Sequence, residues 1–96
     1  MRHVYIVCYD LADPHRCRRV FGLMKGYGDA IQLSVFRCAL TPELHLRMTD
    51  DLLRHINANE DKVLVIDLGP VDGRGAKAMT VLGKSVPSLP TGPFIM

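Results

Sequence analysis

The 96-residue chain has no tryptophan, three tyrosines, three phenylalanines and only three cysteines. The cysteines stand at positions 8, 17 and 38, with no Cys-x-x-Cys spacing. An odd number with this spacing argues against a fold that depends on a framework of disulfide bonds. We therefore expect reduced, buried thiols, since free cysteine packs as a small apolar residue.

Long apolar runs are also missing. The longest run, residues 4–9, has six residues, whereas a membrane-spanning helix needs about 20 and the apolar part of a signal peptide about 7–15. Neither segment is expected, and a soluble cytoplasmic protein with no membrane partner is the default interpretation.

The chain lacks a strong net charge, because 12 lysines and arginines face 10 aspartates and glutamates for a formal charge of +2. Near-neutrality does not exclude nucleic-acid binding, since the placement of charges matters more than their sum. The length supports one domain with one modest core. A hydrophobic share of 48% argues against disorder.

Five segments have the residue patterns of regular secondary structure. Strands are predicted over residues 3–9, over residues 30–40 with a bulge or bend near Val35-Phe36, and over residues 62–68. Between them, one helix begins at Asp13-Pro14 and ends at Gly26 and Gly28, and a second helix runs from Thr41-Pro42 to about Ile56. Their order, with residues 30–40 read as one or two strands, matches an α+β, ferredoxin-like βαββαβ sandwich. Residues 1–69 form this predicted core.

Two helices cover only one face of such a sheet. An apolar face left bare in so short a chain predicts a homodimer that covers it. Residues 70–96 are rich in glycine and proline, and we expect them to form a C-terminal arm that packs on a partner. A short helical turn is expected over residues 76–82, and an additional edge strand over residues 94–96.

Asp10 is the best candidate for chemistry, because it closes the first strand just before a loop and a helix, where ligands gather in layered α/β structures. The alternative is an Asx-type turn with nearby Asp13, although Asp13 is itself expected to be a helix cap. Asp67 is expected to face solvent or a partner. Mg²⁺ often takes one or two carboxylates and keeps waters, so two Asp10 side chains across a dimer axis would satisfy it.

The densest basic cluster is Arg16, Arg18 and Arg19 in the first predicted helix. Guanidinium groups match phosphate oxygens, so this cluster predicts nucleic-acid binding. The alternative is a solvated helix face. The four histidines have no metal-ligand spacing, and only His15 is a candidate proton donor.

Several of these residues together resemble a known family. The motifs are Tyr9-Asp10, Arg19-Val20, Lys25-Gly26-Tyr27-Gly28 and Ile31-Gln32-x-Ser34-Val35-Phe36. In this order, over residues 1–69, they resemble the small CRISPR-associated endoribonuclease family of the spacer-acquisition step, Cas2.

The resemblance implies a ferredoxin-like homodimer whose strand-end aspartates hold a divalent metal such as Mg²⁺. It also implies metal-dependent endonuclease activity on RNA or DNA, and a scaffold role in CRISPR adaptation alongside the Cas1 integrase. Asp10 matches the family's catalytic and metal position, and Tyr9, Arg19 and Phe36 match the surrounding motif. By the same resemblance, the arm packs on the partner subunit or the integrase, and the host is prokaryotic.

The sequence departs from the family pattern at three positions. Ala30 replaces a frequent basic residue, Leu33 a common tyrosine and Cys17 a frequent arginine. Fewer basic groups near the metal weaken the case for catalysis more than the case for scaffolding, although Arg16 or Arg18 can compensate. Three functions therefore stay open: a nuclease, a non-catalytic nucleic-acid-binding module, and a ferredoxin-like small-molecule sensor.

Overall fold

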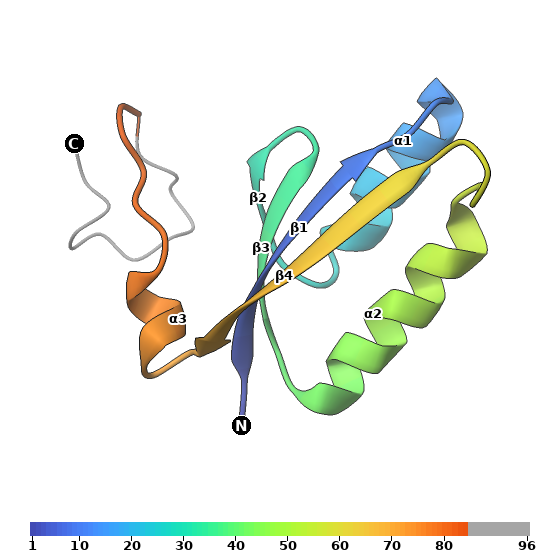
Figure 1. Cartoon of the computed structure of the whole chain (residues 1–96). Helices are drawn as coiled ribbons and strands as arrows, with labels where there is room; N and C mark the ends of the chain where they lie inside the picture. Colours follow the sequence, from blue (N-terminus) through green and yellow to red (C-terminus); the bar gives the residue numbers. More distant parts are fainter. Residues whose placement is uncertain (85–96) are drawn as a thin grey trace.

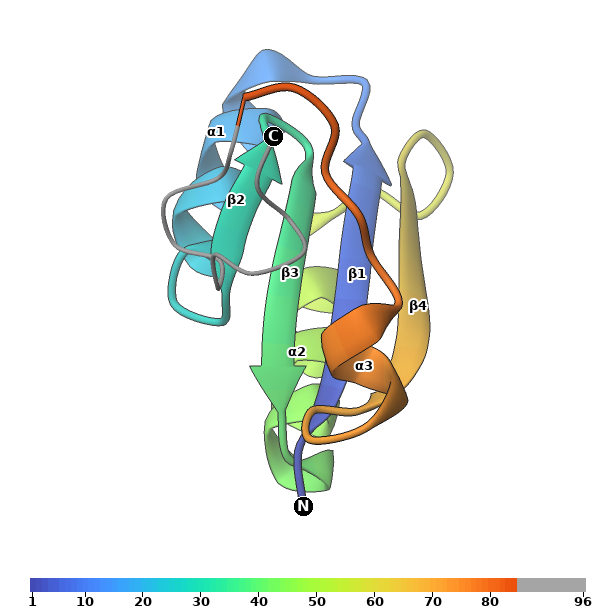
Figure 2. The same ribbon diagram turned by 90° about the vertical axis from the view of Figure 1, so that its left-hand side faces the viewer.

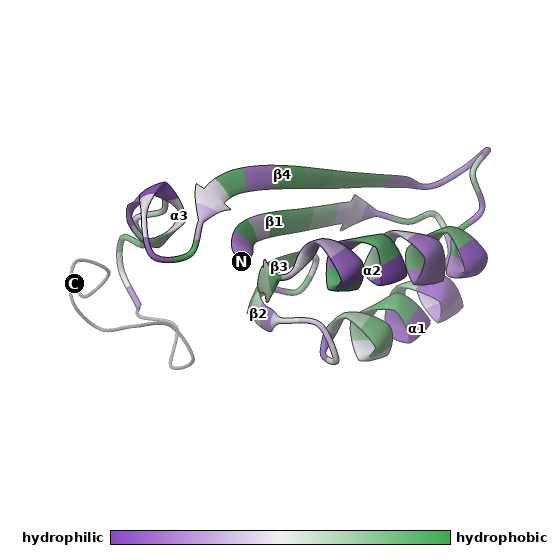
Figure 3. Cartoon of the chain, turned by 90° about the horizontal axis from the view of Figure 1, so that it is seen from below, coloured by the Kyte–Doolittle hydropathy of each residue, from purple (hydrophilic) through white to green (hydrophobic). Residues whose placement is uncertain are grey.

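The chain folds into a four-stranded sheet with two helices packed on one of its faces (Figures 1 and 3). The structure is a computed structural model, and it describes residues 1–84. The elements in chain order are β1 (His3–Asp10), α1 (Pro14–Met24), β2 (Asp29–Gln32), β3 (Val35–Leu40), α2 (Pro42–His55), β4 (Lys62–Pro70) and the short α3 (Arg74–Lys77). The predicted α+β class is confirmed. The additional strand expected over residues 94–96 lies outside the described residues.

The strands lie in the order β2-β3-β1-β4, and every neighbouring pair is antiparallel. Successive side chains of a strand point to opposite faces. Tyr5, Val7 and Tyr9 of β1 are therefore buried beneath the helices, together with Phe36 of β3. Ile6 of β1 lies on the other face, which carries neither α1 nor α2.

Residues 30–40 form two strands joined by a tight turn at Leu33-Ser34. The prediction of a bulge or bend near Val35-Phe36 is confirmed in position, because the chain reverses at Leu33-Ser34, just before Val35, and this reversal produces the phase change in the apolar pattern. A register irregularity also occurs there, in β2 between Ala30 and Gln32, which pair with Phe36 and Val35.

Both predicted helix starts are confirmed. Asp13 accepts a hydrogen bond from the Arg16 backbone N–H at 3.0 Å, and Thr41 accepts one from the Leu44 N–H at 3.2 Å. Each cap satisfies a backbone donor that the first helical turn leaves free.

The helix α1 ends before Gly26 and Gly28, as predicted, and their N–H groups donate to the Leu23 and Met24 carbonyls at 3.1 and 3.0 Å, but the left-handed conformation predicted for them is wrong. Within residues 1–84, positive φ angles occur only at Gly69 and Gly83, so neither glycine adopts the left-handed cap conformation. Gly28 instead lies so close to β3 that a Cβ atom there would clash with the Arg37 carbonyl oxygen and the Cys38 sulfur.

The start of the predicted C-terminal arm packs on its own sheet. The Val71 N–H donates to the Arg2 carbonyl at 3.0 Å. The expected turn over residues 76–82 is found earlier, as α3, where buried Gly75 approaches the carbonyl oxygens of Gly69 and Pro70. Together with residues 78–84, α3 lies on the side of the sheet away from α1 and α2 (Figure 2).

One carboxylate ties the loop after β1 to the loop before β4. The Asp61 side chain is fully buried and accepts hydrogen bonds from the backbone N–H groups of Ala12 at 2.9 Å and Asn57 at 2.7 Å. It also accepts from the Arg16 guanidinium, at 2.8 and 3.1 Å. These hydrogen bonds hold the pKa of Asp61 well below its usual range, and those from Arg16 have a larger effect than those from the two backbone groups.

We predict that Asp61→Asn destabilises the fold. In asparagine an NH2 group replaces one carboxylate oxygen, and the groups that donate to this oxygen lose their acceptor. The free energy of unfolding should fall by several times the effect of Asp50→Asn. That control breaks the exposed Asp50–Arg54 pair in α2, which is worth about 0.3–0.5 kcal/mol. Chemical denaturation at neutral pH measures both variants.

The same interaction sets a pH dependence. Because folding lowers the pKa of Asp61, the unfolded chain binds a proton first as the pH falls, and stability is lost from about pH 4 downward. In Asp61→Asn this part of the acid sensitivity should disappear, whereas Asp50→Asn should keep it. A denaturation series from about pH 5 to about pH 3 tests the expectation, and equal acid slopes for wild type and Asp61→Asn would contradict it.

Candidate functional site

Asp10 is exposed at the carboxyl end of β1. It stands in register with Lys62 of β4, and both residues border a small cavity of about 110 Å³ with Cys8 and Leu64. By strand alternation, Asp10 lies on the sheet face that carries neither α1 nor α2. The carboxylate therefore stands at one end of this face, and α3 packs against the opposite end of β1, near Val4.

The carboxylate of Asp10 makes no hydrogen bond or ion pair with any residue in the described range 1–84. In an Asx-type turn it would accept from the Ala12 N–H. That N–H donates to Asp61 instead, and Asp13 caps α1. The loop is thus held without Asp10, whose carboxylate remains available.

The donor set around Asp10 does not fit a divalent metal within one chain. Residues 1–84 contain no group of three or more histidine, cysteine, aspartate or glutamate side chains placed to hold a metal ion. The register neighbour of Asp10 is a lysine, which repels a cation. The smallest fitting set is two Asp10 carboxylates from two chains, with water completing the six oxygens that Mg²⁺ prefers.

The three clustered arginines differ in their burial and in their hydrogen-bond partners. The Arg16 side chain is largely buried and paired with Asp61 and, at 2.9 Å, with Glu60. The hydrogen bond to Asp61 raises the pKa of Arg16 above its already high value. Arg16 is therefore committed to the fold, and phosphate would have to compete with two carboxylates for it.

Arg18 and Arg19 are exposed on α1. Arg18 donates to His15 Nδ1 at 2.9 Å, so this nitrogen is unprotonated in the contact and does not serve as a proton donor. The acceptor is neutral, and the charge of Arg18 stays uncompensated. Arg19 forms no ion pair within the part of the chain that the structure describes.

Tyr9 and Phe36 are structural residues beneath the site. Their rings stack with centroids 6.3 Å apart, and both are buried. The Tyr9 hydroxyl donates to the Leu33 carbonyl at 2.9 Å, and the Tyr9 N–H donates to the Ser34 carbonyl at 3.1 Å. Burial raises the pKa of Tyr9. Both residues fix the end of β1 against the β2–β3 turn, and Tyr9 also borders the small cavity beside Asp10.

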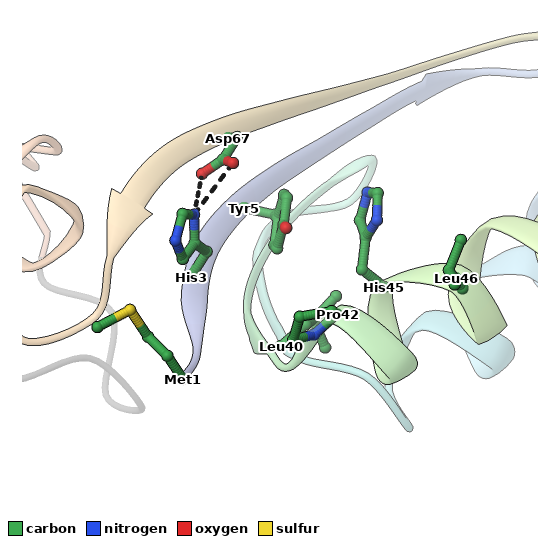
Figure 4. Close-up of a pocket in the computed structure, with 8 residues that line it drawn as sticks. All are labelled: Met1, His3, Tyr5, Leu40, Pro42, His45, Leu46 and Asp67. Atoms are coloured by element: carbon green, nitrogen blue, oxygen red, sulfur yellow. Dashed lines mark hydrogen bonds and ion pairs between the residues drawn. The ribbon is translucent and has the colours of Figure 1, made fainter.

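A second polar cluster, at the opposite end of β1, is missed by sequence reasoning (Figure 4). His3 Nδ1 lies 2.9 Å from Asp67, and the ring of Tyr5 stacks on His45 at 4.6 Å between centroids. Bonds from the Gly69 N–H and then from His3 lower the pKa of Asp67. These side chains border a cavity of about 370 Å³. His3 and Asp67 are 64 positions apart, and only the pairing of β1 with β4 brings them together.

None of the helices within residues 1–84 is both long and apolar enough to cross a membrane. The exposed polar groups of the candidate site are thus Asp10 and Lys62 at the end of the sheet, with Arg18 and Arg19 on α1. Guanidinium groups suit phosphate oxygens and a carboxylate suits a cation, but the two kinds of group lie on different elements of the chain, Asp10 at the end of β1 and Arg18 and Arg19 on α1.

Comparison with known sequences assigns the family. The family model described as CRISPR associated protein Cas2 matches residues 1–72. A protein of Rhodospirillum rubrum, named CRISPR-associated endoribonuclease Cas2 1, is 45% identical over 87 residues, which cover 91% of this chain and 84% of the relative. The CRISPR-associated endoribonuclease Cas2 of Geobacter sulfurreducens is 40% identical over 81 residues, covering 84% and 85% of the two chains.

Solved structures agree with this assignment. Streptococcus pyogenes Cas2, determined at pH 6.5, superposes with a TM-score of 0.72 at 28% identity and covers 83% of this chain and 99% of its own. A hypothetical protein of Thermus thermophilus gives a TM-score of 0.70 at 29% identity, covering 72% and 84%. Sequence and fold lead to one conclusion: the chain belongs to the Cas2 family of CRISPR-associated proteins.

Proposed function

We propose that the protein is a metal-dependent endonuclease of CRISPR adaptation that also forms the dimeric scaffold of the spacer-integration complex. The observation that carries this proposal is Asp10, an exposed carboxylate without a partner in the described chain, placed at the end of an exposed apolar sheet face. The relatives from Rhodospirillum rubrum and Geobacter sulfurreducens, which are named endoribonucleases, support phosphodiester cleavage as the reaction.

The proposed dimer follows from the sheet. The strand order and the antiparallel pairing suit a ferredoxin-like topology, which places α1 and α2 on one face. The other face exposes 53% of Leu64 and 46% of Ile66 in β4, which stand in register with Cys8 and Ile6 of β1. A second copy of the chain would cover this surface and bring two Asp10 carboxylates toward one another.

The proposed cleavage needs a cation, because two carboxylates repel a phosphodiester anion. A divalent metal such as Mg²⁺, when bound by the two Asp10 side chains, supplies Lewis-acid activation of water and of the scissile phosphate. Arg18 and Arg19 would bind flanking phosphates and orient the strand. The Asp61–Arg16 contact fixes the loop between these two groups.

A scaffold that does not cleave is the second candidate. The observation that favours it is the engagement of Arg16 by Asp61 and Glu60, which leaves the neighbourhood of Asp10 with fewer free cations. Phosphate binding by Arg18 and Arg19 needs no metal and suits either function. Docking of residues 70–96 on the partner subunit or on the Cas1 integrase stays a prediction.

For the nuclease, we predict that Asp10→Asn lowers the cleavage rate of RNA or DNA in Mg²⁺ by about 100-fold or more, the scale seen when one stabilising group at a reacting centre is removed. EDTA should abolish cleavage by the wild type. Asp50→Asn, on the exposed side of α2, is the matched control and should cleave normally. Undiminished cleavage by Asp10→Asn would remove Asp10 from the mechanism, and integration supported by an inactive Asp10→Asn would favour the scaffold.

For the dimer, we predict that Ile66→Glu raises the dimer dissociation constant about 100-fold or more, since the substitution enters a symmetric interface twice. Sedimentation equilibrium measures the constant. The control is Leu46→Glu, which changes an exposed leucine on α2. A dimer that tolerates Ile66→Glu but dissociates with Leu46→Glu would place the interface on the helix side of the sheet.

For nucleic-acid binding, we predict that Arg18→Gln combined with Arg19→Gln reduces the salt dependence of duplex DNA affinity. The slope of log K against log salt should become shallower by about 0.9 for each phosphate that the variant no longer neutralises. Arg47→Gln, which removes an exposed cation from α2, should leave the slope unchanged. Equal slopes for the double variant and the wild type would show that α1 does not contact phosphate.

A further inference from the structure

A groove lies between α1 and the β2–β3 turn, on the side of Tyr9 opposite to Asp10. Its volume is about 610 Å³, within the range of sites that hold small organic ligands. The lining includes Tyr9, Phe21, Gly22 and Leu33, and its rim carries Arg18 and Lys25. We call it the α1–turn groove.

The walls of the groove are apolar and aromatic. Phe21 is half-buried, and its ring meets Phe36 edge-on with centroids 5.3 Å apart. Leu33, at the tip of the turn, is 85% exposed. A leucine so exposed, next to a half-buried phenylalanine, forms an apolar surface that a flat ring can contact.

The charged side chains that line the groove are positive. Among residues 1–84, its charged lining residues are Arg18 and Lys25, and no carboxylate within this range lines it. The Lys25 ammonium lies 5.6 Å from the centre of the Phe21 ring, while the hydrogen-bond partner of Arg18 is the neutral His15 nitrogen. A ligand that complements this groove therefore has an apolar, planar part and a negative charge beside it.

The floor of the groove has open space at Gly22. A Cβ atom built there would meet no heavy atom within 4 Å. Glycine in the interior of an exposed helix costs about 1 kcal/mol relative to alanine, and no close backbone contact explains it here. The absence of a side chain keeps the groove open.

We propose that the α1–turn groove binds an unpaired nucleotide of a nucleic-acid strand. The base packs against Phe21 and Leu33, and its phosphate is held by Arg18 and Lys25. Aromatic rings combined with cations are the usual platform for single-stranded nucleic acid, because every base has a face that stacks. This inference rests on the proposed nucleic-acid function and adds a preference for nucleic acid with unpaired nucleotides.

The test compares a blunt DNA duplex with the same duplex carrying one unpaired nucleotide at each end, by fluorescence anisotropy in EDTA so that the DNA stays intact. The wild type should bind the duplex with unpaired ends about tenfold more tightly, the scale of one stacked base. Gly22→Leu, which fills the groove, should remove this preference and keep the affinity for the blunt duplex. Gly22→Ala is the matched control and should retain the preference.

A second variant and a second signal guard against a folding defect. Leu33→Glu places a carboxylate at the exposed tip of the turn and should also remove the preference. With 2-aminopurine as the unpaired base, stacking should quench its fluorescence with wild type and Gly22→Ala, but not with Gly22→Leu.

The outcomes separate this inference from the function on which it rests. Equal wild-type affinity for the two duplexes overturns the groove assignment and leaves nucleic-acid binding intact. Failure to bind either duplex overturns both. A chemical-shift change at Gly22 caused by an acidic peptide containing phenylalanine, and not by either duplex, overturns the assignment in favour of a protein segment.

Discussion

The buried carboxylate of Asp61 is the interaction on which the arrangement of the site depends. It accepts from Ala12 in the loop after β1, from Asn57 in the loop before β4, and from Arg16 on α1. A charge buried this deeply is tolerated only because each of its oxygens has donors. This contact has two consequences for function: the loop after β1 needs no help from Asp10, and Arg16 is used by the fold.

The sequence predicts the fold well where the signal is local. Strand alternation and the Asp13 and Thr41 caps depend on neighbouring residues, and the structure confirms them. The βαββαβ order divides residues 30–40 into two strands, but the sequence does not locate the turn between them, because Leu33-Ser34 lacks the glycine or asparagine that usually marks such turns. A hydrogen bond from Tyr9, 24 residues away, holds the turn instead. The reason for a glycine at position 28 is misread in the same way, since it is the close approach of β3 that excludes a side chain there.

The site is only partly predictable for the same physical reason. Asp10 stands out in the sequence because a strand ends there and a helix cap follows. Arg16, Arg18 and Arg19 look alike in the sequence, and what distinguishes Arg16 is a pairing with Asp61, 45 positions away. The His3–Asp67 pair likewise exists only because β1 and β4 are adjacent, and the α1–turn groove only because the turn lies beside α1. Long-range contacts, which no local pattern encodes, decide which polar groups are left free.

In the proposed dimer, the apolar face and Asp10 depend on one another. Covering Leu64 and Ile66 would remove water from the end of the sheet and so strengthen the repulsion between two Asp10 carboxylates. That repulsion opposes association unless a cation neutralises it, and a cation held by both chains would in turn favour the dimer by mass action. Dimer formation would then increase the affinity for the metal, and metal binding would increase the affinity of the two chains for one another. A single chain, with one free carboxylate and a lysine beside it, has neither the charge nor the geometry to hold a divalent ion, so the proposed metal chemistry requires two copies of the chain.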